Sequence, residues 1–293
     1  MARRRIKLHY DYRGLVLDDF QQEAFWNIEN GTSLLVSAPT GTGKTLIADF
    51  LIDNSLKNKQ RVIYTAPIKA LVNQKYQDFS RQFGRNNIGI ATGDLTIGPD
   101  APVLIVTTEV FRNMLLRSDP RIDALQWVIF DEIHYLDHLQ RGAVWEQSIL
   151  LKPPHVRLLG LSATVPNIAS IAQWIEEIHN EPVAVIVHTE RAVPLRHLYF
   201  NQACEAIPQD KIMQSLAEVT LGQYDAYDFK GGSLTTKDIQ LPRQVKYEDT
   251  TRFMDLVFYL GRHRLFPALF FSFSRKGCEY KAKQVANRRD YLN

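Results

Sequence analysis

Residues 38–45 read Ala-Pro-Thr-Gly-Thr-Gly-Lys-Thr, and this stretch decides the fold of the chain. It fits the phosphate-binding loop pattern G-x-x-x-x-G-K-[ST], except that Ala38 replaces the first glycine. The apolar run at 33–36 suits a buried parallel strand, and residues 46–56 have the apolar spacing of a helix. The sequence therefore predicts a strand, a phosphate-binding loop and a helix in that order.

The chemistry of this loop rests on four of its residues. Gly41 and Gly43 allow backbone turns that a Cβ forbids, so several N–H groups can point at one phosphate. We expect Lys44 to meet the outer phosphates of a nucleotide and the Thr45 hydroxyl to hold Mg²⁺, while the helix N-terminus adds its positive end. The alternative is a glycine-rich turn with an incidental lysine.

The bulk composition limits the class of protein. A chain of 293 residues suggests two domains, and 45% hydrophobic with 23% charged residues is ordinary for a globular protein. The net charge of +3 permits nucleic-acid binding without demonstrating it. Two distant cysteines, Cys204 and Cys278, argue against a disulfide framework and a cysteine zinc site, so a reducing, cytoplasmic compartment is expected. The basic start at residues 3–5 lacks an apolar h-region, and no apolar run suits a bilayer, so no membrane partner is expected.

Beyond the loop, apolar runs alternate with segments of helical spacing. The predicted strands are 61–66, 88–92, 103–107, 127–130, 157–161 and 183–187. The predicted helices are 69–83, 110–117, 143–151 and 168–178. Such alternation predicts an α/β fold with a parallel sheet, helices on both of its faces, and ligands at the carboxyl ends of the strands.

A further helix is predicted before the loop. Asp18 or Asp19 can cap it, and it carries Phe20, Ala24, Phe25 and Ile28 on one face. Phe20 and Gln21 could stack on and hydrogen-bond an adenine. The alternative places Phe20 in the core of an amphipathic helix.

Acidic and small polar residues follow two of the predicted strands. Asp131-Glu132-Ile133-His134 comes directly after an apolar run, and there Asp131 can hold Mg²⁺ opposite Thr45 while Glu132 orients or deprotonates a water. A surface acidic pair is the alternative, and His134 alone would more often be structural. Ser162-Ala163-Thr164 ends the next strand, where small hydroxyls could couple the nucleotide site to a neighbouring surface.

These motifs carry a resemblance to a known family. The phosphate loop, the Asp-Glu-Ile-His stretch and the Ser-Ala-Thr stretch resemble, in that order, motifs I, II and III of the superfamily-two helicases. The connecting segments resemble the superkiller-type (Ski-two-like) branch of DExH-box RNA helicases, which includes the exosome-associated Mtr-type enzymes. Those segments are Ala66 to Lys75, Thr92 to Asp94, Thr107 to Leu115, Arg141 to Glu146, Leu161 to Asn167 and Glu190 to Leu195, so the match covers roughly residues 15–200.

The resemblance implies a RecA-like P-loop NTPase domain followed by the start of a second one. We expect an N-terminal segment with an adenine-binding glutamine motif at 1–30 and the first RecA-like domain at 31–200. A linker or insertion at 201–250 and a truncated beginning of the second domain at 251–293 would follow. The fragment alone is expected to be weak or inactive, since an arginine of the second domain serves hydrolysis in these enzymes.

The function implied is ATP-dependent translocation along single-stranded RNA, 3′ to 5′, with ATP and Mg²⁺ as cofactors and an RNA-degradation complex as a partner. The implied catalytic residues are Lys44, Asp131, Glu132 and His134. The implied ATP contacts are Phe20, Gln21, Pro39, Thr40, Gly41, Thr42, Gly43, Lys44 and Thr45, with Thr45 and Asp131 on the metal. The implied nucleic-acid face is Pro67, Lys69, Thr92, Gly93, Thr108 and Arg112, and Ser162, Ala163 and Thr164 are the implied coupling residues.

Two other functions stay open at this point. One is a DNA helicase of the same superfamily, since the sequence does not read the 2′-hydroxyl directly. The other is an ATP-gated RNA clamp that does not unwind. The residues favour an enzyme over a clamp, because a clamp could dispense with Glu132.

The last third of the chain is less regular. Residues 224–238 have the composition of an exposed connection, and a short helix is expected at 211–219. A helix at 253–260, a strand at 268–273 and a basic helix at 275–286 follow, and Leu269 to Glu279 resembles motif IV of the helicases. A complete single-domain protein with a tail is the alternative.

Overall fold

The computed structural model describes residues 10–138, 141–191, 193–200, 206–208, 211, 250–272 and 274–287. The chain divides into two compact units, Met1–Pro194 and Leu195–Asn293. The first unit is an α/β domain, in which the strands are β1 (Ser33–Ser37), β2 (Arg61–Ala66), β3 (Ile88–Ala91), β4 (Thr96–Ile97), β5 (Val103–Thr107), β6 (Leu125–Asp131), β7 (Arg157–Ser162) and β8 (Val183–Val187). Its helices are α1 (Asp19–Glu29), α2 (Lys44–Lys57), α3 (Lys69–Phe83), α4 (Thr108–Leu116), α5 (Gly142–Leu150) and α6 (Ile168–His179), with 3-10 turns at η1 (Pro120–Ile122) and η2 (Ile133–Asp137).

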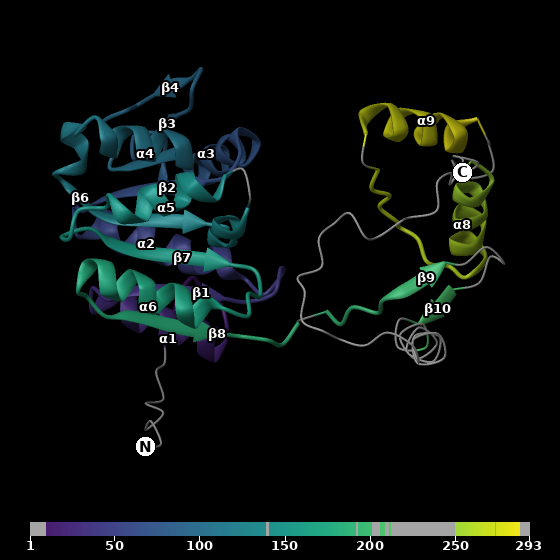
Figure 1. Ribbon diagram of the computed structural model, residues 1–293, viewed down its shortest axis with the longest axis horizontal. Coiled ribbons are helices and arrows are strands. Elements are labelled where there is room, and N and C mark those ends of the chain that lie inside the picture. The colour runs from purple at the N-terminus through teal and green to yellow at the C-terminus, as the bar shows by residue number, and fades with distance from the viewer. Residues whose placement is uncertain are drawn as a thin grey trace, which may run out of the picture. The chain divides into compact units, whose positions relative to one another are not determined.

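One eight-stranded sheet forms the centre of this unit, in the order β4-β3-β5-β2-β6-β7-β1-β8. Every pairing is parallel except that of β4, which runs antiparallel to β3 at the edge. The parallel sheet with helices between its strands confirms the predicted RecA-like arrangement (Figure 1). Because the strands are parallel, their carboxyl ends meet at one edge, which is where the phosphate loop lies.

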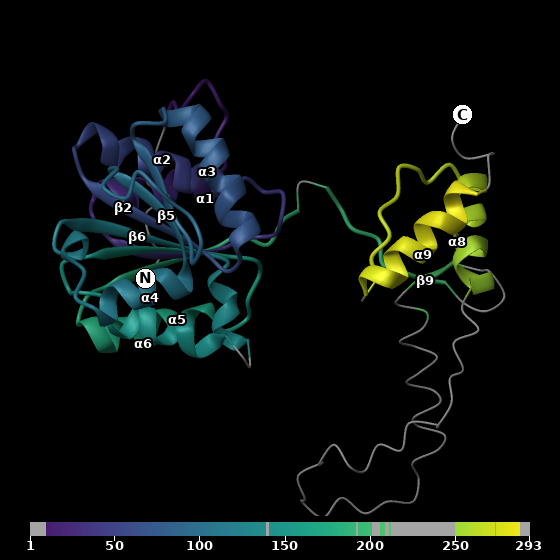
Figure 2. The same ribbon diagram turned by 90° about the horizontal axis from the view of Figure 1, so that it is seen from above.

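Helices cover both faces of the sheet. Figure 2 shows α1, α2 and α3 on one side and α4, α5 and α6 on the other. Alternate residues of one strand face opposite sides, so Leu34 and Val36 of β1 enter one core and Leu35 enters the other. Both cores are built from aliphatic and aromatic side chains of this kind, which explains why the strands read as continuous apolar runs.

In the first unit, the predicted strands and helices agree with the observed ones to within three residues at each end. The strands at 61–66, 103–107 and 183–187 and the helices at 69–83 and 275–286 have their predicted bounds. Asp18 is the N-cap residue of α1, which buries Phe20, Ala24, Phe25 and Ile28 as predicted. The two-residue strand β4 carries no periodic signal, and it was not predicted.

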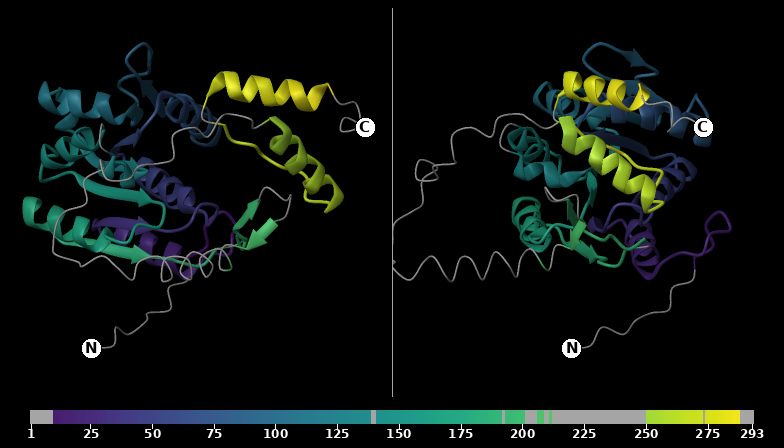
Figure 3. Two further views of the ribbon diagram at one scale, coloured as in Figure 1. Left: turned by 45° about the vertical axis from the view of Figure 1, so that its right-hand side comes forward. Right: turned by 90° about the vertical axis from the view of Figure 1, so that its right-hand side faces the viewer.

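The second unit is described only in part. It contains the antiparallel strands β9 (Leu198–Phe200) and β10 (Ala206–Pro208) and the helices α8 (Thr250–Arg262) and α9 (Arg275–Ala286), which Figure 3 shows in green to yellow. The predicted strand at 268–273 is wrong over its described part: residues 268–272 have no strand partner, and Leu269 and Phe271 are 87% and 90% exposed. A strand forms only where a neighbour accepts its hydrogen bonds. The predicted helix at 211–219, except Lys211, and the predicted connection at 224–238 lie outside the described residues.

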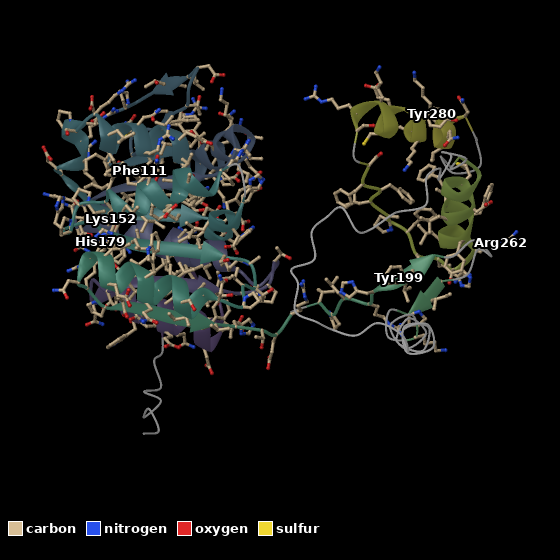
Figure 4. The ribbon with its side chains drawn as sticks, viewed as in Figure 1. Phe111, Lys152, His179, Tyr199, Arg262 and Tyr280 are labelled. Carbon is tan, nitrogen blue, oxygen red and sulfur yellow. The ribbon has the colours of Figure 1, made fainter. Side chains whose placement is uncertain are left out.

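A buried ionic cluster joins the helix layer to the opposite, amino-terminal edge of the sheet. Lys152 is 2% exposed, and its Nζ donates to the Val156 carbonyl at 2.6 Å and lies 3.3 Å from Glu181 Oε1. Glu181 also pairs with Arg157 and accepts from the Ser33 hydroxyl. His179 donates from Nε2 to the Ile149 carbonyl at 2.8 Å, and Figure 4 labels it close to Lys152. In the part of the chain described, no helix has the length and apolarity needed to cross a bilayer.

Candidate nucleotide site and nucleic-acid face

The phosphate loop connects the end of β1 to the start of α2. Gly41 and Gly43 have φ angles of +84° and +81°, in the left-handed region that favours glycine. A Cβ on Gly43 would lie 2.7 Å from Gln21 Nε2, so a side chain there would also force the Gln21 amide to move. The backbone conformation that the motif predicts is therefore present.

Lys44 points back into this loop. Its Nζ donates to the carbonyls of Ala38 at 2.5 Å and Pro39 at 2.8 Å. Burial lowers the pKa of Lys44, and the nearby charges of Glu132 and Asp131 act against that shift. The ammonium group is therefore held by two carbonyls of the loop, which phosphate oxygens could replace.

The acidic pair ends β6. Glu132 has φ +59°, an uncommon conformation for a residue with a side chain, and it turns the chain from the strand into η2. Burial, followed by the charge of Asp131, raises the pKa of Glu132, while His134 and Lys44 oppose the shift. His134 Nδ1 lies 3.3 Å from Glu132 Oε2. A carboxylate with a raised pKa is better suited to accept a proton from water than an ordinary one.

Two residues behind the acidic pair were not predicted to belong to the site. Tyr64 of β2 is fully buried, and its hydroxyl donates to Asp131 Oδ2 at 2.5 Å. Burial, followed by the charge of Asp131, raises the pKa of Tyr64 well above its ordinary value, so this hydroxyl remains a donor. Lys75 of α3 donates to the Thr45 hydroxyl at 3.5 Å.

The oxygen atoms available here fit a magnesium ion held partly by a nucleotide. Thr45 supplies a hydroxyl and Asp131 a carboxylate, both hard oxygen ligands. Among the described residues no three His, Cys, Asp or Glu side chains form a metal cluster. In NTPases Mg²⁺ uses one or two protein ligands together with phosphate oxygens and water.

Gln21 and Phe20 lie in different environments. The Gln21 amide nitrogen donates to the carbonyls of Thr42 at 3.3 Å and Gly43 at 3.4 Å, and its oxygen accepts from the Asp18 backbone at 3.0 Å. Gln21 thus ties α1 to the phosphate loop. Phe20 is 5% exposed and stacks on His188 with ring centroids 4.5 Å apart, so its ring occupies the core. Their adenine contacts stay a prediction.

The Ser162-Ala163-Thr164 stretch is bonded to the strand before the loop. The Ala38 backbone N–H donates to the Ser162 carbonyl at 3.1 Å. The Ser37 hydroxyl donates to the Ala163 carbonyl and accepts from the Val165 N–H, both at 3.2 Å. Thr164 is exposed, so it can contact a surface outside the core. These bonds link the two motifs directly, while the coupling role stays a prediction.

A groove brings several residues of the predicted nucleic-acid face together. Pro67, Lys69 and Gly93 line it, and the other lining residues are Ile68, Thr107, Glu109, Val110, Asn113 and Arg141. Lys69 forms an exposed ion pair with Asp94. Arg141, which was not predicted, donates from Nη1 to the Pro67 carbonyl at 3.0 Å.

The other residues predicted for this face differ in accessibility. Thr92 is partly buried and its hydroxyl accepts from the Leu95 N–H at 3.2 Å. Thr108 is 1% exposed and its hydroxyl donates to the Ala66 carbonyl at 3.5 Å, so its side chain holds two strand ends together. Arg112 donates to Asn113 Oδ1 at 2.9 Å beside the groove. Their contacts with a nucleic acid stay a prediction.

Comparison of the sequence with known protein families shows which family the chain belongs to. Residues 18–171, more than half of the chain, match the DEAD/DEAH box helicase family. The chain belongs to this family. Its phosphate loop, acidic pair and Ser-Ala-Thr stretch all lie within the matched residues, which confirms the resemblance found in the sequence.

Several curated helicases are similar to this DEAD/DEAH box chain. "DExH-box ATP-dependent RNA helicase DExH9" of Arabidopsis thaliana is 37% identical over 92% of this chain, and "Exosome RNA helicase MTR4" of Homo sapiens is 38% identical over 92%. "Antiviral helicase SKI2" of Saccharomyces cerevisiae is 47% identical over 61%. The chain spans only 28%, 26% and 14% of the lengths of these relatives.

Solved structures show the same fold. The "DUF1998 helicase MrfA bound to DNA" superimposes on 59% of this chain, and on 27% of that protein, with a TM-score of 0.50 and 18% sequence identity. At that identity the likeness supports the helicase fold alone.

Sequence reasoning missed residues of this helicase domain whose role depends on contacts between distant segments. Tyr64 and Lys75 reach the site from β2 and α3, and Ser37 joins two motifs. One signal was present: Tyr64 places a hydroxyl within an apolar strand, and a buried hydroxyl requires a partner.

Proposed function

We propose that this chain is the ATP-binding motor domain of a DExH-type RNA helicase that couples ATP hydrolysis to 3′ to 5′ movement along single-stranded RNA. The observation that carries the proposal is that β1 and β6, whose carboxyl ends bear the phosphate loop and the acidic pair, flank the same strand β7 of the parallel sheet. Family membership supports it, and so do relatives whose names describe ATP-dependent and exosome RNA helicases.

Each residue of the site has a task in this proposal. Lys44 exchanges its two loop carbonyls for phosphate oxygens. Glu132, held near His134, accepts a proton from the attacking water. Thr45 and Asp131 hold Mg²⁺, which when bound neutralises charge that develops on the phosphates.

The groove beside Lys69 and Arg141 is the proposed path of the strand. Contacts there are expected to go to phosphate and sugar, because a motor must move along any sequence. RNA is preferred over DNA because the relatives carry RNA in their names. DNA remains the second candidate, since the sequence does not read the 2′-hydroxyl directly.

The partner and the compartment also belong to this proposal. Relatives named for the exosome and for the superkiller complex support an RNA-degradation assembly as the partner. Sparse cysteine usage supports a reducing, cytoplasmic compartment.

The test measures the affinity of the chain for a fluorescent ATP analogue, and then its affinity for single-stranded RNA and DNA of matched sequence with and without a non-hydrolysable ATP analogue. We expect nucleotide binding, and tighter RNA binding when the analogue is present, because coupling between two sites is reciprocal. A chain that binds no nucleotide contradicts the proposal. Equal coupling to DNA would favour the second candidate.

A further inference from the structure

Tyr64 places a hydroxyl group in a buried strand, where an unpaired hydroxyl lowers the stability of the fold. A phenylalanine would fill nearly the same volume, whereas a buried hydroxyl is tolerated only when it finds a partner. The partner here is Oδ2 of Asp131, on the neighbouring strand β6. The hydroxyl therefore acts on the acidic pair and contributes nothing that the apolar core itself requires.

Lys75 connects the same tyrosine to the phosphate loop. Its Nζ lies 5.7 Å from the ring centroids of both Tyr64 and Phe79, and it donates to the Thr45 hydroxyl at 3.5 Å. The two residues expected to hold Mg²⁺, Asp131 and Thr45, are thus each contacted by one member of the packed pair Tyr64–Lys75.

We propose that Tyr64 is a positioning residue for the magnesium-nucleotide site, which commits one oxygen of Asp131 to the protein and directs the other to the cation. Lys75 packs on the tyrosine ring and holds the Thr45 hydroxyl through a hydrogen bond. This inference rests on the proposed function, because it takes Asp131 and Thr45 as the residues that hold Mg²⁺.

The expected effect follows from the general behaviour of residues that orient metal ligands. A carboxylate with one oxygen fixed loses less freedom when it binds a cation. Removing such a partner typically lowers metal affinity about 10- to 100-fold. Nucleotide contacts that do not involve the cation should be unchanged. Loss of the Tyr64 hydroxyl should therefore change only the magnesium dependence of nucleotide affinity.

The experiment compares Tyr64→Phe with Tyr12→Phe. Tyr12 is also buried, its hydroxyl has no hydrogen-bond partner among the described residues, and it packs on Phe25 and Phe50 away from the acidic pair. Each variant is titrated with a fluorescent ADP in EDTA and across a range of Mg²⁺ concentrations. We expect Tyr64→Phe to keep its affinity in EDTA and to need about tenfold more Mg²⁺ or higher for half of the magnesium-dependent gain. Tyr12→Phe should match the wild type in both titrations.

Three outcomes are distinguished. A wild-type magnesium midpoint in Tyr64→Phe overturns the positioning role. An absence of nucleotide binding in the wild type overturns the proposed function instead. Should Tyr64→Phe fold poorly, the same titrations are made with Lys75→Ala, which removes the contact with the Thr45 hydroxyl and leaves the Tyr64 hydroxyl in place: an unchanged magnesium midpoint there overturns the positioning role of the pair.

Discussion

The Ser37 hydroxyl donates a hydrogen bond of 3.2 Å to the Ala163 carbonyl and accepts one of 3.2 Å from the Val165 N–H. One side chain at the end of β1 thus satisfies two backbone groups in the turn after β7. The phosphate loop follows Ser37 directly in the chain, so this contact ties the start of the loop to the Ser-Ala-Thr stretch.

Ser37→Ala should destabilise the chain by about 1 kcal/mol, because it removes two part-buried hydrogen bonds. Urea unfolding followed by circular dichroism measures this. The matched control is Ser55→Ala: Ser55 is equally buried, but its hydroxyl has no hydrogen-bond partner among the described residues, so its loss should cost little. Equal destabilisation by the two variants would show that the bridging contact is unimportant.

Lys44→Ala should lower nucleotide affinity or turnover about a hundredfold or more, since a charge aimed at phosphate oxygens acts in a partly buried site. Glu132→Gln should keep nucleotide affinity and lose turnover, because the amide cannot accept the proton of the water. Both are measured by titration with a fluorescent nucleotide and by phosphate release. Lys57→Ala, at the other end of α2, is the control and should behave as the wild type. Equal loss of nucleotide affinity in Lys44→Ala and Glu132→Gln would contradict the assigned roles.

Lys69→Ala should weaken single-strand binding for all base sequences alike and reduce the salt dependence by about one unit, as expected for one lost phosphate contact. Asp94→Asn should strengthen single-strand binding, because it removes the carboxylate that pairs with Lys69. Fluorescence anisotropy at several salt concentrations measures both. Arg81→Ala is the control, since Arg81 is also exposed and paired, with Asp78, but lies at the far end of α3. An effect confined to particular sequences would mean that Lys69 reads bases.

His179 should make the stability of the chain sensitive to acid. Burial, followed by the charge of Lys152, lowers the pKa of His179 below its ordinary value of 6.5. The folded state therefore favours the neutral ring. The contribution of that ring to the free energy of unfolding is complete above about pH 6.5 and is lost as the pH falls through the folded-state pKa. Urea unfolding at pH 7.5 and 5.5 should show a smaller acid loss in His179→Gln than in the wild type. An identical loss would assign the acid sensitivity to other groups.

Most of the fold could be predicted from the sequence because local patterns and topology agree. The runs at 61–66 and 103–107 are apolar, of strand length and separated by a helical segment, so a parallel sheet follows. The predicted strand at 268–273 shows the limit of this reasoning. An apolar run forms a strand only next to a partner, and partners are a property of the whole domain.

The chemistry of the site could be predicted better than its geometry. Lys44, Asp131 and Glu132 are recognisable because their residue types and spacing are what phosphate and metal chemistry require. The positions of Tyr64 and Thr108 could not be predicted in this way. Tyr64 donates to the Asp131 carboxylate, and Thr108 is buried between the ends of two strands. Those facts depend on register and packing, which spacing along the chain does not encode.

Strand β7 separates the two strands that carry the phosphate loop and the acidic pair, since the order is β6-β7-β1. Neighbouring strands lie about 4.8 Å apart, which puts the ends of β1 and β6 about 10 Å from each other. The strand spacing of the sheet therefore sets the distance between the phosphate loop and the acidic pair. Under the proposed function, a row of phosphates with its cation is long enough to contact both strand ends, whereas AMP or inorganic phosphate is expected to contact only one.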